Sequence, residues 1–228
     1  MADEAFHLLA QTPLFDGFDE PELAPLMKSV RRRKWPRDSY IFREGDPGTD
    51  LYVIAGGEIK ISRMTEAGTE IGLAVLGPGA VFGELAILEE GAVRSADAMT
   101  LAPTECIVLG RPALVAFLQS HPRVMWRVVS LLSAYIRRQD ETVAELAFLD
   151  IPGRVAHKLL ELAERHGEPA GNGIRITLSM SQRTLAGLVG ASRENVNRAL
   201  RMFASLGYIR LDRGQVVVLK PEGLRRRS

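Results

Sequence analysis

The segment from Gln182 to Leu200 constrains the fold of this chain more than any other part of the sequence. Its sequence is QRTLAGLVGASRENVNRAL, and the apolar positions predict two short helices joined by a tight turn. Ala186 is small enough for a second helix to cross closely, and Gly190 falls at the turn, where a positive φ is required. The inward positions are Leu185, Val189, Val196, Ala199 and Leu200, and the outward face of the second helix carries Ser192, Arg193, Glu194, Asn197 and Arg198. This layout is typical of a helix-turn-helix, whose second helix enters the major groove of DNA.

Charge is distributed unevenly along the chain. The total is +1, but residues 1–151 hold 15 Lys and Arg against 22 Asp and Glu, whereas residues 152–228 hold 14 against 6. The first part therefore carries −7 and the second +8. A basic C-terminal part that also contains the helix-turn-helix predicts double-stranded DNA as its partner. A merely solubilising surface is the alternative, and the position of the helix-turn-helix argues against it.

Composition predicts a globular protein of one or two domains, with 228 residues of which 46% are hydrophobic and 25% charged. No apolar run approaches the roughly 18 residues that cross a bilayer. The first residues, MADEAFHLLAQ, form no secretory signal, so we expect a cytoplasmic protein with no membrane partner. The single cysteine, Cys106, excludes an intramolecular disulfide and a multi-cysteine metal site, and we expect it to be buried and no metal to be bound.

The order of patterns predicts an α+β fold. Residues 5–29 are expected to form short helices, and residues 38–109 form many short strands with glycine turns, which is typical of a β-barrel or jelly roll. A helix over 154–166 and a loop from His166 to Gly173 precede the helix-turn-helix. A hairpin that turns at residues 212–214 follows it, as in the wing of a winged helix.

One long helix is predicted between these two parts, because residues 123–149 contain neither glycine nor proline. Seven positions in it alternate in spacing between four and three residues: Val128, Leu132, Tyr135, Gln139, Thr142, Leu146 and Leu149. Such a heptad seam predicts a parallel coiled-coil homodimer, and an amphipathic helix packed on its own domain is the alternative. The polar residues Gln139 and Thr142 either fix the register or contact a ligand.

Three stretches carry a resemblance to the CRP/FNR family of bacterial transcription regulators. They are FGELAILEEGAVRSA (82–96), LAFLDIPGRVA (146–156) and VGASRENVNRAL (189–200), and the resemblance covers nearly the whole chain. It implies a cyclic-nucleotide-binding β-barrel domain over 1–121, a dimerisation helix and hinge over 122–150, and a winged helix-turn-helix DNA-binding domain over 151–228. The function it implies is a homodimeric, sequence-specific DNA-binding transcription regulator that also contacts RNA polymerase.

The first stretch resembles the family's phosphate-binding cassette. Arg94 can donate charge-assisted hydrogen bonds to a cyclic phosphate, and Ser95 can add a hydroxyl. Gly83 permits a close backbone approach, and Glu84 can accept the proton of a ribose 2′-OH. The resemblance assigns these roles, and it adds Leu85, Ile61 and Leu73 to the expected nucleotide site. A weak surface salt bridge between Arg94 and Glu84 is the alternative.

The expected base site departs from the family pattern. Gln139 and Asp140 stand where cAMP-responsive members have a threonine and a serine. An aspartate can accept from the adenine amino group, or from the N1–H and N2–H of guanine. We therefore expect cAMP as the effector, with cGMP, a cyclic dinucleotide or ligand-independent DNA binding as alternatives, and no resident cofactor.

In the third stretch, Arg193, Glu194 and Arg198 match the family's base-contacting residues. Arginine can bind guanine O6 and N7, and glutamate can accept from cytosine N4. The resemblance implies a palindrome of the TGTGA…TCACA kind. Ser181 or Ser179 is expected to cap the first helix and Ser192 the second. Further expected contacts to the DNA backbone come from Ser179, Arg183, Ser192 and Asn197.

Other classes of protein find less support in the sequence. One cysteine is too few for an iron–sulfur oxygen sensor, and the four histidines are scattered rather than placed as haem ligands. Neither a Walker loop nor a nucleophile elbow is present, so we expect no enzyme. A nucleotide-binding module whose C-terminal domain docks on protein is a further alternative, which the +8 charge argues against.

Overall fold

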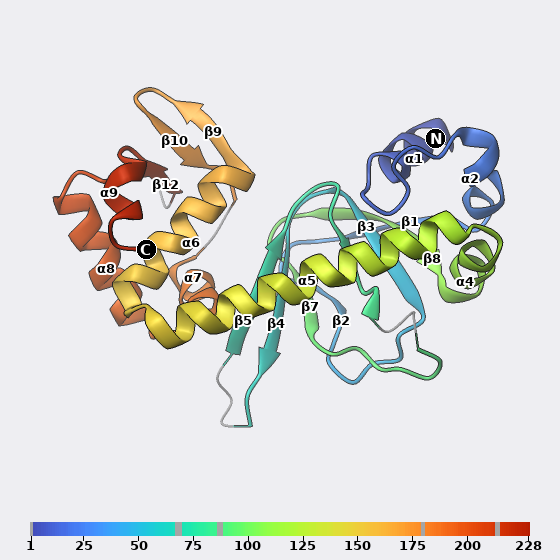
Figure 1. Ribbon diagram of the computed structural model, residues 1–228, viewed down its shortest axis with the longest axis horizontal. Helices are drawn as coiled ribbons and strands as arrows, with labels where there is room; N and C mark the ends of the chain where they lie inside the picture. The colour runs from blue at the N-terminus through green and yellow to red at the C-terminus, as the bar shows by residue number, and fades with distance from the viewer. Residues whose placement is uncertain (1, 67–69, 86–88, 179–180, 213–214) are drawn as a thin grey trace. The chain divides into compact units, whose positions relative to one another are not determined.

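The computed structural model describes residues 2–66, 70–85, 89–178, 181–212 and 215–228 (Figure 1). The chain folds into two compact units. The N-terminal unit comprises residues 1–61 and 75–138, and the C-terminal unit comprises residues 62–74 and 139–228. Among the described residues, no helix is long and apolar enough to cross a membrane.

The strands that precede the long helix form two four-stranded sheets, as in a jelly roll, rather than one closed barrel. One sheet has the order β1-β8-β3-β6 and the other β2-β7-β4-β5. The strands are β1 (Arg31–Trp35), β2 (Tyr40–Phe42), β3 (Asp50–Gly56), β4 (Ile59–Met64), β5 (Glu70–Leu76), β6 (Val81–Phe82), β7 (Asp97–Thr100) and β8 (Thr104–Gly110). The predicted jelly roll is therefore confirmed.

Strand β3 is buried on both faces, and this explains its continuous apolar sequence. Leu51 and Val53 pack into a core formed with the N-terminal helices, whereas Tyr52 and Ile54 point into a second core between the sheets. Cys106 on β8 belongs to the second core and is fully buried, as predicted. Burial raises the pKa of its thiol to about 12, so the thiol stays protonated and unreactive.

Capping residues set the ends of the helices. Asp19 and Glu22 form a capping box on α2, and Asp150 accepts from the backbone N–H of Gly153 at 2.8 Å to start α6. The predicted long helix is α5, with 27 residues. The helices are α1 (Ala2–Ala10), α2 (Glu20–Met27), α4 (Arg111–Ser120), α5 (Pro122–Phe148), α6 (Ile151–His166), α7 (Gln182–Leu188), α8 (Arg193–Ser205) and α9 (Pro221–Arg225).

The C-terminal sheet is larger than the sequence suggests. Its order is β11-β12-β10-β9, with β9 (Gly167–Ala170), β10 (Gly173–Ile176), β11 (Ile209–Asp212) and β12 (Gln215–Val218). The predicted wing hairpin corresponds to β11–β12. The prediction of a loop from His166 to Gly173 is wrong, because β9 and the start of β10 lie there. Strand β10 pairs with β12 and aligns β9 beside it, and Pro169 is tolerated because β9 is an edge strand.

Candidate effector site and nucleic-acid interface

Arg94 lies in the interior of the N-terminal unit, where it is only 3% exposed. Its Nη1 donates to the carbonyl of Gly83 at 2.9 Å, and its Nη2 donates to the carbonyl of Asp50 at 2.7 Å. Its Nε is buried without a hydrogen-bond partner among the described residues. This burial excludes the alternative of a surface salt bridge, and a buried cationic donor without a partner is suited to an anion.

Gly83 must be glycine in this arrangement. Its φ is +78°, and a Cβ there would lie 2.7 Å from Arg94 Nη1 and 3.3 Å from the carbonyl oxygen of Asp50. The arginine of the same cassette therefore lies directly against Gly83, while the expected approach of Gly83 to a nucleotide stays a prediction.

Two aromatic rings that no sequence motif singles out complete the surroundings of Arg94. The guanidinium carbon lies 4.2 Å from the ring centroid of Phe42 and 5.5 Å from that of Tyr52. Burial lowers the pKa of Arg94, and Tyr52, Asp50 and Glu84 partly offset this effect. Only the tertiary fold brings these rings, which lie on β2 and β3, to Arg94.

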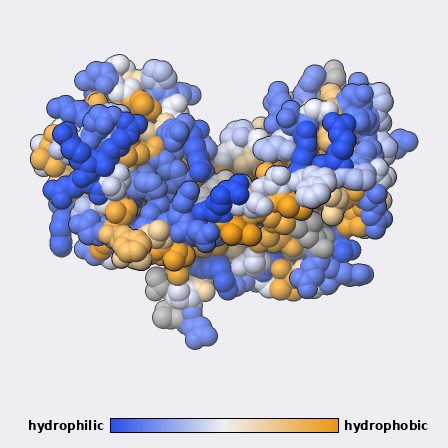
Figure 2. Space-filling view, viewed as in Figure 1, coloured by the Kyte–Doolittle hydropathy of each residue, from blue (hydrophilic) through white to orange (hydrophobic). Residues whose placement is uncertain are grey.

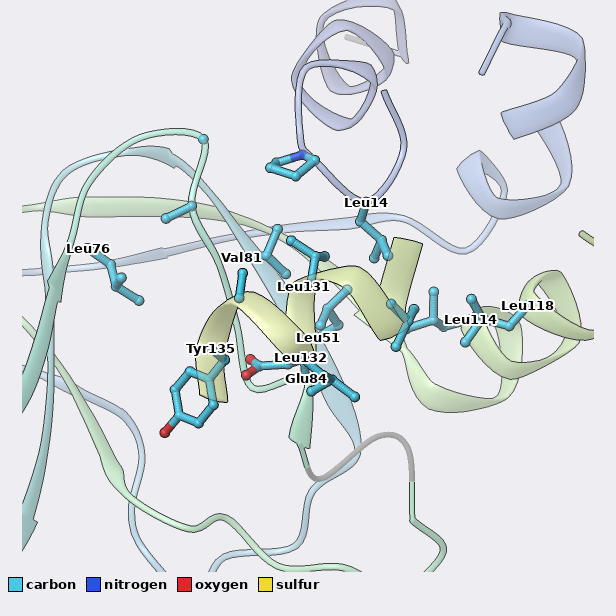
Figure 3. A pocket seen from close by; sticks show the side chains of 15 residues that line it. Leu14, Leu51, Leu76, Val81, Glu84, Leu114, Leu118, Leu131, Leu132 and Tyr135 are labelled. Atoms are coloured by element: carbon cyan, nitrogen blue, oxygen red, sulfur yellow. The ribbon is translucent and has the colours of Figure 1, made fainter. Parts of the chain in front are cut away.

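Glu84 lines a cavity of about 270 Å³ in the same unit (Figure 3). The wall is mostly apolar and includes Leu51, Leu76 and Val81 from the sheets and Leu132 and Tyr135 from α5. Burial raises the pKa of Glu84, although its own backbone hydrogen bond and Arg94 act in the opposite direction. Tyr135, which the sequence suggested only for the dimer seam, thus also borders the candidate effector site.

The other predicted nucleotide contacts are less enclosed. Ser95, Leu85 and Leu73 are exposed, and Ile61 is half-buried against the second core. Gln139 and Asp140 are exposed on α5. The structure therefore brings together Gly83, Glu84 and Arg94. It places Ile61 against the second core and leaves the other members of the predicted set exposed.

The helix-turn-helix has the predicted local structure. Ser181 accepts from the backbone N–H of Thr184 at 3.1 Å, and Ser192 accepts from that of Asn195 at 3.3 Å, so both predicted caps form. Gly190 has a φ of +60°, and a Cβ there would lie 3.3 Å from Leu146 Cδ2. The predicted inward residues are all buried: Leu185, Ala186, Val189, Val196, Ala199 and Leu200.

The recognition face of α8 is exposed. Arg193, Glu194 and Arg198 are all open to solvent, as are Ser192 and Arg183. The backbone hydrogen bond of Glu194, assisted by Ser192, lowers the pKa of its carboxyl, so the side chain is a ready acceptor.

Asn197 does not belong to the exposed face. It is half-buried, and its Nδ2 donates to Gln182 Oε1 of α7 at 3.0 Å. The outward position expected for Asn197 is thus only partly exposed, and its expected contact with the DNA backbone stays a prediction. Ser179 lies outside the described residues.

The helix α5 presents more exposed apolar surface than the predicted seam contains. In that seam Val128 and Leu149 are half-buried, whereas Gln139, Thr142 and Leu146 are exposed. An adjacent exposed stripe consists of Met125, Val129, Ile136 and Val143, each at least 46% exposed. Met125, Val129, Ile136 and Val143 lie beside the predicted seam, because each is three or four residues from a member of it.

Comparisons with known proteins agree with this architecture. Residues 32–121 match the family model of the cyclic nucleotide-binding domain, and residues 153–227 match that of the Crp-like helix-turn-helix domain. The chain is 38% identical over 221 residues to the CRP-like cAMP-activated global transcriptional regulator of Mycobacterium tuberculosis, covering 97% of this chain and 98% of that one. It is 35% identical to the cyclic AMP receptor protein of Thermus thermophilus, covering 91% and 92%.

Among solved structures, the c-di-GMP responsive global regulator CLP of Xanthomonas campestris superposes with a TM-score of 0.76 at 26% identity, covering 88% of this chain and 99% of that one. A cyclic nucleotide-binding domain followed by a helix-turn-helix defines a class of DNA-binding transcription regulator. The chain belongs to the CRP/FNR family of these regulators.

Proposed function

We propose that this protein is a homodimeric transcription regulator whose binding to a palindromic DNA site is controlled by a cyclic nucleotide. The observation that carries the effector half is Arg94, which is buried and charged, is bound through Nη1 to Gly83, and has no hydrogen-bond partner for Nε among the described residues. A cyclic phosphate is singly charged and presents acceptors that suit such a donor. Glu84, at the wall of the adjacent cavity, would accept the ribose 2′-OH.

Cyclic AMP is the proposed effector. The names of the relatives from M. tuberculosis and T. thermophilus refer to cAMP, and both relatives align with nearly the whole chain. A cyclic dinucleotide is the second candidate, because CLP is described as responsive to c-di-GMP. Gln139 and Asp140 replace the family's usual base contacts, and their side chains could hydrogen-bond either adenine or guanine.

The proposed dimer forms through α5. Exposed apolar side chains follow this helix over its whole length, and Figure 2 shows hydrophobic surface along its course. Burying such a stripe against a second copy removes apolar area from water. Val128 lines the cavity of its own unit, whereas Met125, Val129, Ile136 and Val143 are open. We therefore propose that these four residues share the interface with the predicted seam.

The proposed DNA contacts come from α8. Arg193, Glu194 and Arg198 would contact base edges of a TGTGA-like half-site, while Ser192 and Arg183 would contact phosphates. Two recognition helices would engage half-sites about 34 Å apart, which requires the dimer. The protein would act in the cytoplasm, where it meets DNA and RNA polymerase, and it would carry out no catalysis.

Calorimetric titration of the full chain with cAMP, cGMP and c-di-GMP tests the effector directly. We expect one cAMP per subunit and weaker binding of both cGMP and c-di-GMP. Binding of none of the three, or binding that survives Arg94→Ala unchanged, would contradict the proposal. Sedimentation of the same protein should give a dimer, and a monomer at micromolar concentration would contradict recognition of a palindrome.

A further inference from the structure

Arg94 is held by an aromatic stack as well as by backbone carbonyls. Tyr52 and Phe82 stack with ring centroids 5.0 Å apart and an interplanar angle of 17°, and Phe42 packs against both at 5.7 and 5.9 Å. The guanidinium lies over Phe42 at 4.2 Å. A desolvated cation over an aromatic face is attracted by the ring quadrupole.

Two of the three rings, those of Tyr52 and Phe82, come from the backbone segments that supply the carbonyl partners of Arg94, whereas Phe42 comes from β2. Asp50 and Tyr52 are alternate residues of β3, and they supply a carbonyl to Nη2 and a ring to the guanidinium. Phe82 precedes Gly83, whose carbonyl accepts from Nη1. Arg94 is therefore held from two sides, by the two carbonyls and by the rings of Phe42 and Tyr52.

We propose that Phe42 and Tyr52 are positioning residues for Arg94 that set the affinity of the site for an anionic effector. The rings hold the guanidinium in one orientation, and binding of the phosphate would depend on that orientation. They act through Arg94 and need not contact the ligand. This inference rests on the proposed cyclic-nucleotide binding for its effect on affinity, but the positioning itself is a property of the ligand-free protein.

The first test is therefore a double-mutant cycle on ligand-free, full-length protein, with Phe42→Leu, Arg94→Ala and the double variant followed by urea unfolding. The two changes should be strongly non-additive, because each removes the same contact. Tyr40→Leu and Arg43→Ala provide the matched control, since Arg43 lies 4.1 Å from the Tyr40 ring centroid but Tyr40 is 41% exposed. Coupling at Phe42–Arg94 no larger than at this exposed pair would overturn the proposal.

The second test measures cAMP affinity in the same variants by calorimetry. Phe42→Leu should weaken binding about fivefold to thirtyfold, while Phe42→Tyr, which keeps the ring, should stay within about twofold of wild type. In the Arg94→Ala background, Phe42→Leu should have no further effect. An equal weakening in both backgrounds would overturn the proposal, because the ring would then act without the arginine. If the wild type binds no nucleotide, the proposed effector fails, and the ligand-free cycle still decides whether the rings position Arg94.

Discussion

The two candidate sites place their arginines in opposite environments. Arg94 is 3% exposed, with both η nitrogens bound to backbone carbonyls, whereas Arg193 and Arg198 are open to solvent on α8. In the C-terminal unit the rigid part is the frame beneath the side chains, which is held by the serine caps and the buried inward residues.

This difference suits the two proposed ligands. A small anion gains most from a buried, preoriented cation, because the low dielectric strengthens the hydrogen bond and little entropy is lost. A DNA duplex arrives with its own hydration and counterions, and long exposed side chains can adjust to its base edges. Substitutions in the first site should therefore abolish ligand binding. In the second site their effect should depend on the sequence of the DNA.

The largest effect is expected for Arg94→Ala. Loss of a charged hydrogen bond in a buried site should weaken cAMP binding by about 3 kcal/mol, or more than about 100-fold, in calorimetry. Arg43→Ala, which removes an exposed arginine of the same unit, should leave the affinity unchanged. Equal effects of the two substitutions would mean that net charge, and not the buried geometry, determines binding.

Arg193→Ala tests the exposed site. We expect a loss of about 1–3 kcal/mol on a TGTGA palindrome and little loss on random DNA, measured by fluorescence anisotropy. Arg201→Ala removes the same charge from an exposed position further along α8. It should weaken binding to both DNAs equally. A uniform loss for Arg193→Ala would contradict a base-contacting role.

The turn of the helix-turn-helix provides the third test. Gly190→Ala should lower the free energy of unfolding by roughly 2 kcal/mol, because a positive φ is strained for alanine and the new Cβ meets Leu146. Gly171 has a similar φ of +66°, and no described atom lies within 4 Å of its Cβ position, so Gly171→Ala should cost only about 1 kcal/mol. Equal costs would show that the contact with Leu146 contributes nothing.

The bond between Asn197 and Gln182 should have a smaller effect. A double-mutant cycle with Asn197→Ala and Gln182→Ala should give a coupling of about 1 kcal/mol in thermal or urea unfolding. Additive changes would mean that Gln182 does not hold Asn197. Asn197 would then be available on the exposed face, where a DNA contact was expected.

The smallest effect concerns pH. Burial raises the pKa of Glu84, and the ribose hydroxyl donates to the ionised carboxylate, so binding favours loss of a proton. Affinity for cAMP should therefore fall as the pH drops through this raised pKa, by about threefold to tenfold per unit at most. Glu84→Gln should bind more weakly and show no such slope. A slope that persists in Glu84→Gln would assign the proton to another group.

The sequence predicted the exposed site more fully than the buried one, for a physical reason. Helical periodicity and serine caps determine which residues of 182–200 point inward, so most of the motif follows from local rules. The hydrogen bond of Asn197 could not be predicted in this way because its partner lies on another helix. Similarly, no local pattern shows that Arg94 lies over Phe42 and Tyr52, since β2, β3 and the cassette meet only in the folded protein.

The C-terminal sheet gives the same lesson. Gly167, Pro169 and Gly171 indicate a loop by composition, yet β10 pairs with β12 and brings β9 into the sheet. Pairing between segments some forty residues apart overrides local propensity there.

The buried arginine is proposed to control the exposed ones through a bound nucleotide, and the proposed regulation depends on this link. Anisotropy of a labelled TGTGA palindrome, titrated with the wild type and with Arg94→Ala in the presence and absence of saturating cAMP, tests it most directly. We predict that cAMP tightens DNA binding by the wild type at least about tenfold and leaves the variant unchanged. DNA affinity that is the same for both proteins, with and without cAMP, would contradict this link.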